Sequence, residues 1–137
     1  MDNTLTPAHN ALPIESSFAF VDKCRKLGMD FYIISNNHSE RVKKVADPLS
    51  VGYYYSTKKP FGRRLLKFLE TKNIDTTRCV VIGDQLLTDV FYANRLGIRS
   101  ILVEPISDKD LLITFINRRI DKLIRHNLRK KDRLKQL

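Results

Sequence analysis

The sequence has no long apolar run, no cluster of cysteines, no internal repeat and no low-complexity linker. A membrane-spanning helix needs about 20 consecutive apolar residues, and no window approaches that length, which excludes an integral membrane protein. The only two cysteines, Cys24 and Cys79, lie far apart and form no CxxC pair, so the sequence indicates neither a zinc site nor a redox pair. No signal peptide is recognisable, and we therefore expect a reducing, cytoplasmic location.

The charge of the chain is the strongest compositional signal. The 137 residues carry 25 Lys and Arg against 15 Asp and Glu, a net charge of +10, which favours polyanions or anionic lipid surfaces as partners. Much of this excess is C-terminal, because residues 117–137 contain nine basic and two acidic side chains. With 42% apolar residues and no linker, the chain is expected to form one core.

Short apolar runs predict the strands of a parallel sheet. Phe31–Ile34, Cys79–Ile82 and Ser100–Val103 are too short for helices and rich in β-branched residues, which is typical of buried parallel strands. Tyr53–Tyr55 predicts a weaker strand.

Longer amphipathic segments between these runs predict helices. They are Ser17–Leu27, which Gly28 would close, then Pro60–Thr71, and Asp89–Leu96 followed by Gly97. Strands that alternate with helices indicate an α/β fold with right-handed crossovers.

Polar clusters follow two of the predicted strands directly. Ser35–Asn37 and Gly83–Gln85 stand where the carboxyl ends of parallel strands form a ligand-binding crevice. Asp2–Leu5 is a similar cluster, but the strand that should precede it is absent from this chain. We expect all three clusters to meet in one crevice.

Four motifs in order carry a resemblance to a known family. They are DNTL at 2–5, IISNN at 33–37, KKP at 58–60 and GDQLLTDV at 83–90. Their order and chemistry resemble the haloacid dehalogenase (HAD) superfamily of aspartate-nucleophile phosphatases. More narrowly, GDQLLTDVFYANRLG, the KP pair and INRRID resemble the YqeG-like subclass IIIA phosphatases, a group similar to the phosphatidylglycerophosphate phosphatases. The resemblance covers nearly the whole chain.

The resemblance implies a HAD-like Rossmannoid parallel sheet with flanking helices, no cap domain, and a first strand that is missing here. The phosphatase domain would cover residues 1–116, incomplete at its N-terminus, and 117–137 would form a basic amphipathic C-terminal helix or tail of the same domain. The intervals from Leu5 to Ser35 and from Ser35 to Lys59 have room for one helix each, which leaves none for a cap. An open crevice suits a phosphate carried on a large body or a membrane surface.

The resemblance also assigns catalytic and phosphate-binding roles. Asp2 takes the acid/base position of the family's DxD motif, so the nucleophilic aspartate would directly precede Met1. The Ser35 hydroxyl, with the backbone N–H groups of Asn36 and Asn37, would hold phosphoryl oxygens, and Lys59 would supply positive charge. The alternatives are a turn carboxylate for Asp2, a plain Asx turn at Ser35 and a solvated lysine at 59.

A Mg²⁺ site is the cofactor that the resemblance implies, with Asp2, Asp84 and Asp89 as its metal residues. Asp84 stands at a strand end after the permissive Gly83, and hard divalent ions take one or two carboxylates together with water and phosphate. Asp89 could bind the metal through water, fix Lys59, or merely cap a helix.

The hypothesis is a Mg²⁺-dependent phosphomonoesterase acting on phosphatidylglycerophosphate, with an anionic lipid headgroup as partner and the basic C-terminus at the membrane surface. This 137-residue form is expected to be poorly stable, because the central strand that should precede Asp2 is missing, and inactive as a phosphatase, because it lacks the nucleophile. Two alternatives stay open: a catalytically silent basic protein that binds RNA, ribosomes or anionic lipid, and a phosphatase of soluble sugar or nucleotide phosphates. The C-terminal helix is predicted from apolar residues at helical spacing, namely Phe115, Ile116, Ile120, Leu123, Ile124 and Leu128.

Overall fold

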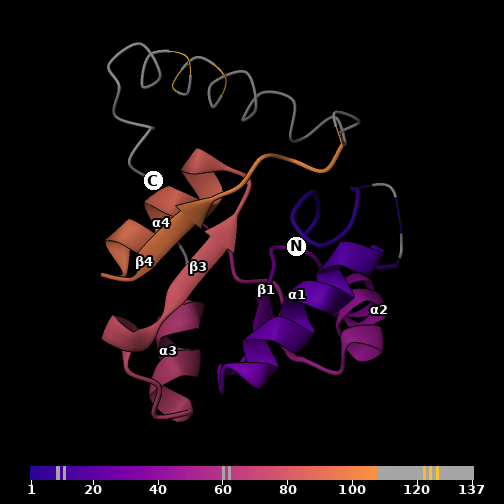
Figure 1. Cartoon of the computed structure of the whole chain (residues 1–137). Helices are drawn as coiled ribbons and strands as arrows, with labels where there is room; N and C mark the ends of the chain where they lie inside the picture. The colour runs from indigo at the N-terminus through magenta and orange to yellow at the C-terminus, as the bar shows by residue number, and fades with distance from the viewer. Residues whose placement is uncertain are drawn as a thin grey trace.

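The computed structural model describes residues 1–8, 10, 12–59, 61, 63–107, 122, 124 and 126. Helices and strands alternate along this part of the chain, which confirms the α/β prediction (Figure 1). In chain order the elements are α1 (Glu15–Lys26), β1 (Tyr32–Ile34), α2 (Ser39–Leu49), β2 (Gly52–Tyr54), α3 (Arg64–Thr71), η1 (Thr76–Arg78), β3 (Val80–Gly83), η2 (Leu86–Val90), α4 (Phe91–Arg95) and β4 (Arg99–Leu102).

The strands form two separate parallel pairs. Tyr32 of β1 lies opposite Gly52 of β2, and Val80 of β3 lies opposite Arg99 of β4. Helix α2 connects the first pair, while η2 and α4 connect the second. Among the described residues no hydrogen-bond ladder joins the two pairs.

The predicted strands are confirmed within one residue at each end, whereas two of the helix predictions differ more. Helix α1 ends as expected before Gly28, which has a φ of +71°. Helix α3 begins at Arg64 rather than at Pro60, which lies outside the described residues. The cause is a turn, since Lys58 has a φ of +55° and the Phe61 N–H donates to its carbonyl at 3.1 Å.

Helix α2 is the α-helix that the sequence did not locate. One helix was expected between Ser35 and Lys59, but its bounds were not predicted. Its buried side chains include Val42, Val45 and Leu49, which share one face of the helix. The signal was therefore present in the sequence, although mostly polar residues and Pro48 surround it.

Two hydrophobic cores lie on either side of the break in the sheet. We call the elements α1 to β2 the first half and α3 to β4 the second half, and Figure 1 shows them on opposite sides of the molecule. Ile34 packs against the core of the second half, and the Phe68 ring contacts Tyr32 and Tyr54 at centroid distances of 5.4 and 4.9 Å. These contacts hold the halves together. The first core contains Leu5, Val21, Ile33, Val42, Val45, Ala46 and Leu49, and the second contains Leu65, Leu69, Val81, Tyr92, Ala93 and Ile98.

The described chain has no room for a cap domain in either interval where one was considered, because α1 with β1 and α2 with β2 fill them. None of the described helices is long and apolar enough to cross a bilayer. Of residues 117–137 the structure describes only Lys122, Ile124 and His126, so the predicted C-terminal helix lies outside the described residues apart from these.

Candidate active site

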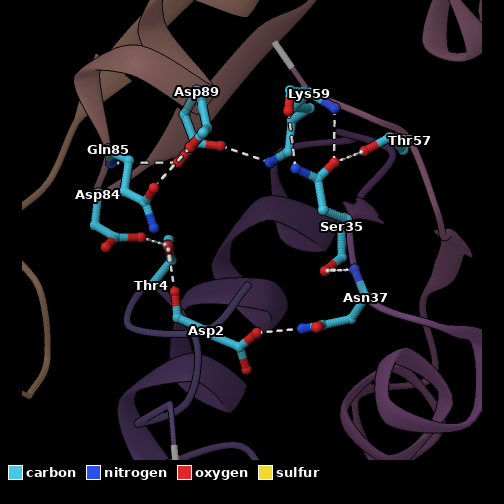
Figure 2. Close-up of polar contacts among 11 residues, drawn as sticks. Asp2, Thr4, Ser35, Asn37, Thr57, Lys59, Asp84, Gln85 and Asp89 are labelled. Carbon is cyan, nitrogen blue, oxygen red and sulfur yellow. Dashed lines mark hydrogen bonds and ion pairs between the residues drawn. The ribbon is translucent and has the colours of Figure 1, made fainter. Parts of the chain in front are cut away.

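The three polar clusters of the sequence meet at the carboxyl ends of β1 and β3 (Figure 2). Ser35 directly follows β1, and Asp84 directly follows β3. The N-terminal segment crosses between them, because Asn37 Nδ2 donates to Asp2 Oδ2 and the Thr4 hydroxyl donates to Asp84 Oδ1 at 2.8 Å. The two halves are therefore joined where α/β proteins bind their ligands.

A buried ion pair lies in the middle of the site. Lys59 Nζ and Asp89 Oδ1 are 2.5 Å apart, and both side chains are only 8% exposed. Lys58, in contrast, is exposed, so of the two adjacent lysines Lys59 is the one that the structure brings into the site. Removing these two charges from water costs solvation free energy. The attraction between them keeps both side chains ionised in this buried place.

The environment of Asp89 favours its ionised form. Burial acts to raise the pKa of Asp89, but the charges of the Lys59 ammonium and the Met1 α-amino group, together with hydrogen bonds from Lys59 and Gln85, hold that pKa below its ordinary value. The Gln85 backbone N–H adds a hydrogen bond to Asp89 Oδ2 at 3.3 Å. Asp89 thus makes a local, cap-like contact and also fixes Lys59, two of the alternatives considered from the sequence.

Asp89 reaches its place through a π-helical turn rather than an α-helix start. The N–H groups of Asp89 and Val90 both donate to the Gln85 carbonyl, at 2.9 and 3.3 Å, within η2. The prediction of a regular helix from Asp89 is therefore wrong at its beginning, and the helix proper starts at Phe91. Such π-turns occur often at functional sites because they redirect one or two side chains.

Gly83 makes room for this arrangement. A Cβ atom at Gly83 would lie 2.3 Å from the Asp89 carboxyl carbon, far inside van der Waals contact. Only glycine lets Asp89 pack so closely over the end of β3. The sequence suggested that Gly83 matters because of Asp84, which follows it. The structure shows that the side chain a Cβ at position 83 would meet is that of Asp89.

Asp84 is the second buried carboxylate of the site. The residue is 4% exposed, and burial raises its pKa above the ordinary value, with the charge of Asp89 acting in the same direction. The Met1 α-amino group and the hydrogen bond from Thr4 oppose this rise without cancelling it. Asp84 is thus a carboxylate whose charge would be stabilised by a further cation.

The Asn36 side chain has a role that the sequence did not suggest. Its Oδ1 accepts hydrogen bonds from the Lys59 backbone N–H at 2.7 Å and the Thr57 hydroxyl at 2.9 Å, while its Nδ2 donates to the Lys59 carbonyl at 3.0 Å. The amide therefore fixes the backbone that presents Lys59. No long-range signal in the sequence pairs Asn36 with Lys59, so spacing could not reveal this contact.

The turn after β1 presents groups that suit an anion. The Ser35 side chain is buried, and its Oγ accepts a hydrogen bond from the Asn37 backbone N–H at 3.2 Å, as in the plain turn considered from the sequence. Among the described residues no acceptor takes the backbone N–H of Asn36. The Ser35 hydroxyl proton and this N–H are thus available to oxygen atoms of a ligand.

Asp2 faces away from the other two carboxylates. Its Oδ1 lies 2.6 Å from Arg41 Nη2 on α2, and its Oδ2 accepts from Asn37, so both oxygens are occupied. No three His, Cys, Asp or Glu side chains in the described part of the chain are grouped so that they could hold a metal. The structure therefore does not bring the predicted set of Asp2, Asp84 and Asp89 together, because Arg41 and Asn37 turn Asp2 aside.

Asp84 is the residue that would hold Mg²⁺, because both oxygens of Asp89 already accept hydrogen bonds from Lys59 Nζ and the Gln85 N–H. Burial and the charge of Asp89 both disfavour the charge on Asp84, a cost that a divalent cation relieves. Mg²⁺ accepts one or two carboxylates and fills its remaining positions with water and phosphate oxygens. The donor chemistry of the site fits this ion.

Comparisons with known proteins point in the same direction as the geometry. A family model described as "HAD-hyrolase-like" matches residues 57–119. A protein of Bacillus subtilis (strain 168) called "Probable phosphatase YqeG" is 34% identical over 131 residues, which cover 96% of this chain and 76% of that protein.

A solved structure is similar in fold. It is the crystal structure of an uncharacterized protein from Listeria monocytogenes serotype 4b, with a TM-score of 0.63 and 22% identity over 81% of each chain. At this identity the likeness concerns the fold alone.

Proposed function

Because the chain belongs to the HAD superfamily and, within it, to the YqeG-like phosphatases, we propose that it is a Mg²⁺-dependent phosphomonoester hydrolase that works through an aspartyl phosphate. The observation that supports this most is the buried Lys59–Asp89 pair beside Asp84 and Ser35 at the strand ends. A cation, a carboxylate and hydrogen-bond donors around one point are what phosphoryl transfer needs.

Residues from both halves would stabilise the phosphoryl group during transfer. Lys59, held in place by Asp89 and by the Asn36 amide, balances charge on the phosphoryl oxygens. The Ser35 hydroxyl and the Asn36 N–H donate hydrogen bonds to them. Mg²⁺, when bound at Asp84, neutralises further negative charge on the phosphoryl group.

The nucleophile would be an aspartate that directly precedes Met1, as the resembled motif requires. Its carboxylate attacks phosphorus, the bond to the ester oxygen breaks, and the leaving alkoxide takes a proton from Asp2. Asp2 then removes a proton from the water that hydrolyses the acyl phosphate to inorganic phosphate. Both Asp2 oxygens are occupied by Arg41 and Asn37, so Asp2 must turn to act.

The proposal is tested by extending the chain upstream with an apolar strand that ends in Asp directly before Met1. We expect Mg²⁺-dependent release of phosphate from a generic phosphoester by the extended chain. The matched control carries Asn at the same position and should be inactive, as should the 137-residue chain. Equal turnover by all three proteins would contradict the proposed nucleophile.

For the substrate we propose phosphatidylglycerophosphate at the cytoplasmic membrane surface. The lack of room for a cap in the two intervals described and the net charge of +10 support a phosphate on an anionic lipid headgroup. Phosphate release should be fastest from this lipid in vesicles, compared with glycerol phosphate, sugar phosphates and nucleotides. Preference for one of the soluble esters would retain the enzyme class and overturn the substrate.

A catalytically silent binding protein for RNA, ribosomes or anionic lipid is the second candidate. The observation that favours it is Asp2, whose carboxylate is tied to Arg41 and Asn37 rather than directed at the other acidic groups. Salt-sensitive RNA binding together with no turnover by the extended chain would support this candidate.

A further inference from the structure

Two exposed aromatic rings form a small surface at the site that the proposed function does not use. Phe61 is 70% exposed and Phe91 is 44% exposed, yet their rings contact each other edge to face, with centroids 6.5 Å apart. The Arg95 guanidinium lies over both rings, 5.4 Å from the centre of Phe61 and 5.9 Å from that of Phe91. We call Phe61, Phe91 and Arg95 the aromatic rim. Exposed apolar side chains that gather in this way usually mark an interaction surface.

The aromatic rim is tied to the site through the chain. Phe61 follows Lys59 by two residues, and Phe91 follows Asp89 by two residues. Lys59 and Asp89 form the buried ion pair, so the segments that carry the two rings are fixed against each other at their base. The ring pair is therefore the exposed continuation of the site.

The chain segments next to the two rings are basic. Lys58, Arg63, Arg64 and Arg95 are exposed, and residues 56–69 and 91–103 contain no Asp or Glu at all. Apolar rings flanked by cations are complementary to a bilayer whose headgroups are anionic and whose interior is apolar.

We propose that the aromatic rim is a docking surface for an anionic lipid bilayer. RNA is the alternative ligand for a basic, aromatic surface. Bases of single-stranded RNA bind by stacking on open faces of aromatic rings. Here Arg95 covers both rings and the rings contact each other, so part of the face that a base would use is already occupied. Insertion among lipid chains requires only exposed apolar surface. The inference rests on the proposed function only in that docking would place the site at its lipid substrate.

The test measures vesicle binding by the full 137-residue chain without any turnover, so its outcome is separate from that of the proposed phosphatase activity. The probes are phosphatidylcholine vesicles with and without phosphatidylglycerol, and co-sedimentation is the readout. We expect binding only to the anionic vesicles. The double variant Phe61→Ser/Phe91→Ser should lose at least about tenfold in partition coefficient, because the rings supply the apolar part of the contact.

A matched control removes equally exposed apolar side chains elsewhere. Leu27 and Met29 are 64% and 55% exposed and lie beside the basic end of α1, so Leu27→Ser/Met29→Ser removes a comparable exposed apolar surface next to basic side chains. This control should bind like the unmodified chain, and circular dichroism checks that both variants are folded.

Three results would overturn the proposal. They are no binding of the unmodified chain to anionic vesicles, equal loss in both double variants, and unchanged vesicle binding by the Phe61/Phe91 variant. If that variant instead loses affinity for a single-stranded RNA while its vesicle binding is unchanged, the aromatic rim is a nucleic-acid surface.

Discussion

The two halves of the molecule have the same architecture but supply different chemistry. Each has one parallel strand pair and its own hydrophobic core. The first half contributes neutral hydrogen-bonding groups at the end of β1, Ser35 and Asn36, whereas the second contributes the buried carboxylates Asp84 and Asp89 at the end of β3. Lys59 lies on the segment between the halves and bonds to both. The site therefore depends on how firmly that segment and the N-terminal segment hold the halves in register.

The largest effect is expected from removing the charge of Asp89, which separates the second half from Lys59. In Asp89→Asn the Lys59 ammonium stays buried without its partner, and loss of one member of a buried pair costs about 3–5 kcal/mol of the free energy of unfolding. Urea denaturation at neutral pH measures this difference.

The exposed ion pair between Asp22 and Arg25 provides the control. Its side chains are 62% and 44% exposed, so Asp22→Asn should cost less than about 1 kcal/mol. Acid should abolish the contrast, because the pKa of Asp89 is lowered. The contribution of Asp89 to the free energy of unfolding is complete above the ordinary carboxyl pKa of about 4. It disappears as the pH falls through the lower pKa that Asp89 has in the folded protein. Similar losses in both variants at neutral pH would contradict the importance of burial.

Gly83→Ala tests the packing within the second half alone. The new Cβ would lie 2.3 Å from the Asp89 carboxyl carbon, so Asp89 must move, and overpacking of this kind costs about 1–3 kcal/mol. Gly28→Ala is the control, because nothing lies within 4 Å of its Cβ and only the φ of +71° is unfavourable. A chemical-shift change at Lys59 in Gly83→Ala but not in Gly28→Ala would show that the clash is transmitted to the ion pair. Unchanged chemical shifts at Lys59 in both variants would contradict transmission of the clash to the ion pair.

Asn36→Ala tests how strongly the first half holds the segment between β2 and α3 that carries Lys59. Three hydrogen bonds to Thr57 and Lys59 are lost, and because Asn36 is exposed, water can replace them in part. We expect a loss of about 1–2 kcal/mol and faster amide hydrogen exchange at Lys59. Asn94→Ala, an exposed position on α4, should leave that exchange rate as it is. If amide exchange at Lys59 is unaltered in Asn36→Ala, the Asn36 side chain does not fix the Lys59 backbone.

Asp84→Asn should have the smallest effect, and in the opposite direction. Burial raises the pKa of Asp84, so its stabilising contribution is greatest at low pH and is lost as the pH rises through the raised value. The variant escapes that loss and should gain about 1 kcal/mol at neutral pH, as is common when functional groups are removed. Mg²⁺ should raise the Tm of the unmodified chain but not that of Asp84→Asn. Destabilisation at neutral pH, or an equal Mg²⁺ response in both, would contradict this role.

The strands were predictable because the apolar runs are too short for helices and rich in β-branched residues. Helix α2 was not located, because Pro48 and many charged residues obscure the apolar face of Val42, Val45 and Leu49. The π-helical turn before α4 could not be predicted either, since hydrophobic periodicity does not distinguish it from an α-helical turn.

The site was predictable as a set of segments but not as a set of contacts. The polar residues after β1 and β3 identified Ser35 and Asp84, because parallel strands end at one edge. The contacts of Arg41 with Asp2 and of Asn36 with Lys59 join residues far apart in the sequence, and no spacing rule connects them. The direction in which Asp2 points therefore emerged only from the fold.

The most direct test of the proposed chemistry is to trap the phosphorylated protein. The chain extended upstream with a strand ending in Asp is mixed with phosphoester and Mg²⁺, quenched in acid and analysed by mass spectrometry. We expect one phosphoryl group on the aspartate directly before Met1, and none in its Asn variant or in the 137-residue chain. Turnover without this adduct, or an adduct on Asp84 instead, would contradict the proposed chemistry.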